Sequence, residues 1–177
     1  MLSLAQQQEN LRAIVQGRPA DTLGDRWLTE VSASQGLQVL RATIAWWQRF
    51  QIEAQCRYTS RLLKRLDRFE RCVEACYRDH SAPPSIEELS TMFLRSLETH
   101  EELLVRAVAA FELACLAPPR PGEPGRTIEW DRNPVDMILA LDRCEPLPHS
   151  EPGAQYILRI AAHLPGGMQC IREELPA

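Results

Sequence analysis

The sequence predicts an α+β protein, in which an N-terminal α-helical bundle is followed by a small C-terminal antiparallel sheet with one helix. Three observations predict this class. Apolar residues before residue 117 recur at helical spacing, and those after residue 125 alternate with the period of a strand. Between them, residues 117–125 contain four prolines and two glycines, which neither a helix nor the interior of a sheet tolerates. We therefore expect a helical bundle at 1–116, a linker at 117–125 and a small sheet domain at 126–177.

The first helices are identified by apolar residues three or four positions apart. An opening helix is expected to end near residues 17–19, before a short helix over 21–31. A third helix starts at Gly36, and after a bend between Gln51 and Arg57 a long stripe continues to Cys76. The residues that define these helices are Leu4, Leu11, Ile14 and Val15, then Leu23, Trp27 and Leu28, then Leu40, Ile44 and Trp47, and finally Tyr58, Leu62, Leu66, Phe69, Val73 and Cys76.

Two further helices are predicted by their N-terminal sequences. Ser85 followed by Glu88, and Thr99 followed by Glu102, both have capping-box spacing, in which the cap hydroxyl and the later carboxylate each bind a free backbone amide. The second of these helices, which extends to about Leu116, is apolar on nearly every side and should be the most buried. Glu112 lies within it and therefore needs an arginine or amide partner.

The region after residue 125 has the pattern of a small sheet. Residues 126–130 resemble a strand, and Asn133-Pro134 is a strong helix start, with asparagine at the cap and proline at the first helical position. Residues 156–161 alternate as a strand does, and the turn at 164–167 leads into a hairpin partner at 168–173.

Such a sheet has unpaired edges, and an exposed edge can accept a further strand. We therefore expect an extended peptide to bind by β-augmentation. The sequence does not distinguish 156–161 from 168–173 as the edge strand, and the helical half could instead cover the edge. The expected peptide-binding residues are Tyr156, Ile157, Leu158, Arg159, Ile160, Met168, Cys170 and Arg172.

Composition favours a soluble protein that does not bind nucleic acid. The chain of 177 residues has a net charge of −4, whereas DNA-binding domains usually carry a basic surface. A stripe of basic residues does occur, at Arg61, Lys64, Arg65, Arg68 and Arg71, but acidic residues interrupt it. This pattern is typical of a helix surface that faces solvent. The alternatives are that the stripe binds an acidic partner, or that the chain is a regulatory protein and the stripe binds DNA. The N-terminal residues lack the basic start and apolar stretch of a signal peptide, and the most apolar run, 103–116, is too short for a membrane span. We expect a cytoplasmic location.

No catalytic constellation is present in the sequence, so an independent enzyme is the least favoured class. Six cysteines are interpreted as small packed side chains, although Cys72, Cys76 and His80 could hold a metal if a fourth ligand joined them. We expect no metal or cofactor in this chain. Trp46, Trp47 and Phe50 cannot all face one core, so one tryptophan is expected to face a groove or a partner, and these three residues are the expected partner interface.

Three stretches resemble a known family. The opening residues 2–11 (LSLAQQQENL), the helix 105–114 (VRAVAAFELA) and the ending 156–160 (YILRI) with 164–167 (LPGG) are similar to bacterial partner proteins of multinuclear non-haem iron oxidases that modify peptides. Relatives of these partner proteins have been labelled as a DNA-binding domain. The resemblance covers most of the chain, and each motif is short.

The resemblance implies a function without catalysis in this chain. Such proteins form a heterodimer with a TIM-barrel oxidase, which holds the iron. They bind a ribosomally synthesised precursor peptide, whose leader adds a strand to the C-terminal sheet, and present its cysteine to the oxidase. Carbon excision at a C-terminal cysteine, as in 3-thiaglutamate pathways, and oxazolone–thioamide formation, as in methanobactin pathways, are the reactions implied. No catalytic residue is carried over.

Overall fold

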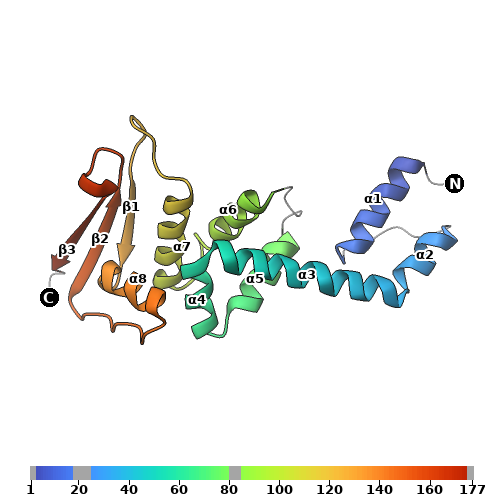
Figure 1. Ribbon diagram of the computed structural model, residues 1–177, viewed down its shortest axis with the longest axis horizontal. Helices are drawn as coiled ribbons and strands as arrows, with labels where there is room; N and C mark the ends of the chain where they lie inside the picture. The colour runs from blue at the N-terminus through green and yellow to red at the C-terminus, as the bar shows by residue number, and fades with distance from the viewer. Residues whose placement is uncertain (1–2, 18–24, 80–84, 175–177) are drawn as a thin grey trace. The chain divides into compact units, whose positions relative to one another are not determined.

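The computed structural model describes residues 3–17, 25–79 and 85–174, and it has the α+β class that the sequence predicts (Figure 1). The chain divides into two compact units, residues 1–50 and 51–177, and the helix α3 contributes to both. The elements are α1 (Leu4–Val15), α2 (Arg26–Ser32), α3 (Gln35–Gln55), α4 (Arg57–Arg65), α5 (Phe69–Asp79), α6 (Ile86–Ser96), α7 (Leu103–Leu116), β1 (Arg126–Trp130), α8 (Pro134–Arg143), β2 (Ala154–Ile160), a 3₁₀ turn (Pro165–Gly167) and β3 (Met168–Glu174).

The first unit is a small group of three helices. A capping box between Ser3 and Gln6 starts α1, and the Asp25 side chain caps α2. Ile14, Leu28 and Leu37 form its apolar core. Of the short helix predicted over 21–31, the described part begins at Arg26, whereas Leu23 lies outside the described residues.

The long stripe from Tyr58 to Cys76 forms two helices rather than one. α4 ends at Arg65, where Asp67 adopts a left-handed conformation with φ 53°. The amide of Arg68 donates to the carbonyl of Leu63 at 2.8 Å, and that of Asp67 donates to Lys64. This is a Schellman ending, for which aspartate is one of the few suitable residues besides glycine and asparagine. Apolar spacing alone does not reveal it.

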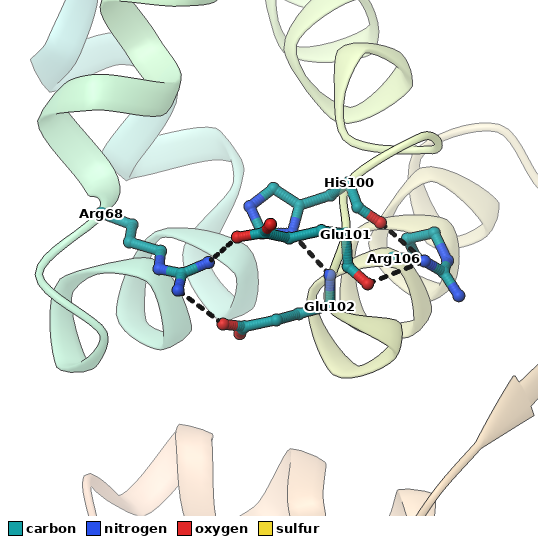
Figure 2. Close-up of polar contacts among 5 residues, drawn as sticks. All are labelled: Arg68, His100, Glu101, Glu102 and Arg106. Atoms are coloured by element: carbon teal, nitrogen blue, oxygen red, sulfur yellow. Dashed lines mark hydrogen bonds and ion pairs between the residues drawn. The ribbon is translucent and has the colours of Figure 1, made fainter.

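Ser85 caps α6 by accepting from the amide of Glu88, which is one half of the predicted capping box, whereas the box predicted at Thr99 is absent. The amide of Glu102 donates to Nδ1 of His100 at 3.1 Å, and the Glu102 carboxylate pairs with Arg68 at 2.8 Å (Figure 2). Both groups that the box would use therefore have other partners. Arg106 donates to the carbonyls of His100 and Glu101, so α7 begins one turn later, at Leu103.

One core spans the proline-rich stretch at 117–125. The Phe111 ring of α7 packs edge-on against Trp130 of β1, with ring centroids 6.4 Å apart, and both belong to the same apolar cluster. The sequence predicted a domain boundary here; the structure instead has a connection within the unit at 51–177. At its end, Gly125 permits close approach to β2, because an added Cβ would lie 2.8 Å from the Ile160 carbonyl oxygen.

The sheet is antiparallel, in the order β1-β2-β3 (Figure 1). Ile128 lies opposite Leu158 in the first pair, and Leu158 lies opposite Cys170 in the second. Asn133 caps α8 as the sequence predicts, and its Oδ1 accepts from the amide of Val135 at 2.9 Å.

The buried Glu112 carboxyl group joins α7 to α4. Glu112 is 4% exposed, and its two oxygens accept the amides of Tyr58 and Thr59, each at 2.9 Å. These amides lie in the first turn of α4, where Cys56 provides no side-chain cap. The amide partner that the sequence required for Glu112 is therefore a helix N-terminus, and the carboxyl group takes the place of a local cap.

Burial raises the pKa of Glu112, and the hydrogen bonds from Thr59 and Tyr58 only partly offset the rise. The folded chain therefore binds this proton more tightly than the unfolded chain does. The resulting stabilisation is complete below the ordinary pKa of 4.5 and is lost as the pH rises through the folded-state pKa.

We predict that the free energy of unfolding of the wild type, relative to Glu112→Gln, falls as the pH rises through this window. Urea titrations at a series of pH values measure the difference, because the glutamine variant lacks the titrating group. Glu98→Gln, the same substitution at an exposed position, is the control. A difference that grows with pH would contradict the assignment.

Candidate functional site

The candidate site is the free edge of the sheet at β3. β2 pairs with β1 on one side and β3 on the other, so 156–161 is the central strand, and its alternative assignment as the edge is wrong. Every residue of β3 is exposed except Ile171, which is half-buried. β1 is the other edge, and its Ile128 and Trp130 are buried in the core shared with α7.

The hydrogen-bonding phase of β3 follows from the hairpin. The amide of Ala161 donates to the carbonyl of Gly167 at 3.0 Å, which places these two residues at a hydrogen-bonding position of the ladder next to the turn, although the Gly167 amide donates to Leu164. Hydrogen-bonded and non-hydrogen-bonded pairs alternate along an antiparallel ladder. Gln169 and Ile171 therefore bond toward β2, whereas the N–H and C=O groups of Met168, Cys170 and Arg172 face the free edge.

The same three residues also lie beside the core face of the sheet. They are opposite Ile160, Leu158 and Tyr156, and residues directly opposite each other place their side chains on the same face. The buried residues of β1 and β2 belong to the core with α7 and α8, but β3 contributes none. The face of β3 that continues the core, with its exposed Met168 and Cys170, is therefore an open shelf.

An ion pair lies at the far end of the shelf. Arg172 Nη2 is 3.0 Å from Glu151 Oε2. Burial and a hydrogen bond with Glu151 raise the pKa of Tyr156, the neighbour of Arg172 across the ladder. Sequence reasoning did not include Glu151, because nothing local indicates that the loop before β2 reaches the end of β3.

The predicted peptide-binding residues thus divide into three groups. Met168, Cys170 and Arg172 offer backbone groups to the free edge. Tyr156, Leu158 and Ile160 are buried in the core. Ile157 and Arg159 lie on the opposite face of the central strand, where Ile157 is half-buried and Arg159 is exposed.

The predicted partner surface on α3 is an aromatic cluster of Trp46, Trp47 and Phe50. These residues are 61%, 50% and 50% exposed, so both tryptophans face outward, whereas the sequence placed Trp47 on the packed stripe. Leu37, which the sequence did not place on this stripe, is the residue by which α3 contributes to the core of the first unit. The three rings contact one another, with centroid separations of 5.6 to 6.0 Å.

The basic stripe is largely occupied by contacts within the chain. Arg61 donates to the carbonyl oxygens of Leu141 and Asp142 at the end of α8, at 2.8 and 2.6 Å. Arg65 donates to the Glu145 carbonyl, and Lys64 pairs with Glu53. Arg68 holds Glu101 and Glu102 (Figure 2). Four of the five stripe residues therefore join elements of the fold.

The cysteine thiols with a perturbed pKa are less reactive than usual. Burial raises the pKa of Cys56 to about 12, and it also raises the pKa values of Cys72, Cys115 and Cys170. A reactive thiol has the opposite shift. No group of three or more potential metal ligands occurs among the described residues, and His80 lies outside them.

A half-open pocket of about 800 Å³ lies along α6, between the ends of α3 and α7. Its lining includes Glu87 and Glu88 in the first turn of α6, Arg95 in the last turn, and Met92 and Leu116. Acidic residues at the start of a helix and a basic residue at its end stabilise the helix dipole, which is sufficient reason for this charge pattern.

Comparison with protein-family models, curated proteins and solved structures found no match. Within the part of the chain that the structure describes, no helix combines the length and hydrophobicity needed to cross a membrane.

The alternating direction of the amides along β3 predicts that proline lowers stability by unequal amounts at two adjacent exposed positions. Gln169→Pro removes an amide that bonds toward β2, whereas Cys170→Pro removes one that faces the free edge. We expect Gln169→Pro to lower the free energy of unfolding by about 1–3 kcal/mol more than Cys170→Pro does. Urea denaturation checks this difference. Equal losses, or a larger loss for Cys170→Pro, would mean that the opposite amides face outward.

Proposed function

We propose that this chain is a peptide-binding subunit that takes up an extended peptide at the free edge of β3. The observation that carries the proposal is the combination of outward backbone groups at Met168, Cys170 and Arg172 with an open shelf on the same three residues. A peptide strand pairing there would form ladder hydrogen bonds, and alternate side chains would extend the apolar face beyond Met168 and Cys170.

The composition of β3 fits a strand that stays unpaired until a ligand arrives. Charged side chains are common on edge strands, where they oppose uncontrolled pairing between copies. Arg172, Glu173 and Glu174 occupy the last three positions of β3. They leave Met168 to Ile171 as the less charged part, which is where we expect the peptide to pair first.

The family resemblance extends this proposal to a partner. In this extension, the peptide is a ribosomal precursor, and a TIM-barrel iron oxidase modifies its cysteine by carbon excision or by oxazolone–thioamide formation. The chain then acts as the accessory subunit of a heterodimer, and the oxidase holds the iron. The aromatic cluster of α3 is the proposed oxidase contact, because exposed large aromatics are frequent anchors at interfaces.

The alternative, a DNA-binding regulator built on the helices, has less support. The basic candidate that the sequence offers is the stripe from Arg61 to Arg71, and most of those side chains already bind α8, Glu53 or the loop before α7. DNA binding would require these cations to be available to phosphates.

A displayed library of random linear peptides, selected on the purified chain, tests the central proposal. We expect the selected peptides to lose at least tenfold in affinity for Cys170→Pro, since that variant lacks an outward amide. Cys170→Thr, which keeps the amide, is the matched control and should bind as the wild type does. Unchanged affinity for a folded Cys170→Pro variant would show that the peptides bind elsewhere.

The partner proposal predicts a separate effect. Trp46→Ala should weaken association with an oxidase encoded beside this chain by about 2 kcal/mol or more, the usual size of a hot-spot effect. Titration calorimetry measures the change, with Gln38→Ala on another face of α3 as the control. Equal affinity for both variants would remove this surface from the interface.

A further inference from the structure

The outward face of α3 is an uncharged strip that the first unit does not cover. Val39 and Leu40 are 61% and 46% exposed, and they lie on the same side of the helix as the aromatic cluster. Gly36 and Thr43, which are also exposed, complete the strip. The opposite side of α3 packs through Leu37 against α1 and α2, and Arg41 donates to the carbonyl of Ile14 at 2.9 Å.

The spacing of this strip is symmetric about Thr43. Its members occupy positions 36, 39, 40, 43, 46, 47 and 50, so the intervals are three, one and three on each side of position 43. Small or aliphatic residues occupy one half, and the aromatic cluster occupies the other. A second copy laid antiparallel across Thr43 would therefore place Phe50 over Gly36, Trp47 beside Val39 and Trp46 beside Leu40.

Two details suit such a pairing. Apart from the adjacent residues and the backbone of α3 itself, no described atom lies within 4 Å of the position that a Cβ on Gly36 would occupy, so the space above this residue is open to an incoming ring. The Thr43 hydroxyl already donates to the Val39 carbonyl at 2.9 Å, so burial of Thr43 at the centre would leave no hydroxyl without a partner.

We propose that the free chain forms a symmetric homodimer through antiparallel pairing of α3 with α3 of a second copy. An aromatic side chain buries about 150–250 Å² in full, and these three are 50–61% exposed, so together with Val39 and Leu40 the strip exposes roughly 500 Å² on each copy. The pair then buries about 1,000 Å², at the lower limit for a specific interface. The dimer is accordingly weak and exchangeable.

This inference does not rest on peptide binding at β3. It concerns the same helix face as the proposed oxidase contact, and the two occupants exclude each other. In the absence of the oxidase, the second copy covers the aromatic cluster. An oxidase that binds this face more tightly would displace the second copy.

Sedimentation equilibrium of the full chain over a concentration series tests the proposal. The wild type should approach twice the monomer mass of 20.1 kDa at the highest concentrations. Thr43→Glu and Thr43→Lys should each raise the dimer dissociation constant at least tenfold, because like charges then meet at the symmetry axis. An equimolar mixture of the two variants should regain association. Gln38→Glu, an equal charge change outside the strip, should leave the constant unchanged.

The direction of pairing has its own test. In the antiparallel arrangement Gly36→Leu fills the space that Phe50 of the second copy occupies, so it should weaken the dimer at least tenfold. In a parallel arrangement Gly36 would meet Gly36, and the same change would strengthen association. A wild-type chain that stays monomeric throughout, a dimer insensitive to Thr43→Glu, or variants that do not associate when mixed would overturn the proposal.

Discussion

The hydrogen bonds from the first turn of α4 to the buried carboxyl group of Glu112 are the constraint on which the rest of the larger unit depends. They fix α4 against α7, the most buried helix. One face of α4 then reaches α8, where Arg61 and Arg65 bind the carbonyl groups at its C-terminal end and Arg57 pairs with Asp142. The buried Glu112 thus positions the arginines that hold α8, and α7 and α8 together form the helical layer that packs on the sheet.

This arrangement also determines which part of the sheet stays accessible. The core that α7 and α8 share with the sheet includes residues of β1 and β2 and none of β3. β3 is held by its ladder to β2 and by the ion pair between Arg172 and Glu151. The outward amides of β3 face the free edge, and the face of β3 that continues the core is exposed. The proposed peptide site therefore exists because α7 and α8 share a core with β1 and β2 but not with β3.

Local sequence signals predicted what local contacts decide. Ser85 and Asn133 cap their helices, and alternation identified both strands of the hairpin, because each signal acts within a few residues. Predictions failed where distant groups compete. His100 and Arg68 take both partners of the Thr99 box, and contact between Phe111 and Trp130 makes one core of two predicted domains. The order of the strands was equally hidden, although the charged end of β3 is a signal that could have identified the edge strand.

Amide hydrogen exchange along β3, measured with and without a selected peptide, distinguishes strand addition at this edge from binding elsewhere. In the free chain, we expect slow exchange at Gln169 and Ile171 and fast exchange at Met168, Cys170 and Arg172, because only the first two amides bond toward β2. Bound peptide should slow the three fast amides and leave the other two nearly unchanged. Fast exchange that persists at Cys170 and Arg172 in the saturated complex would contradict strand addition at this edge.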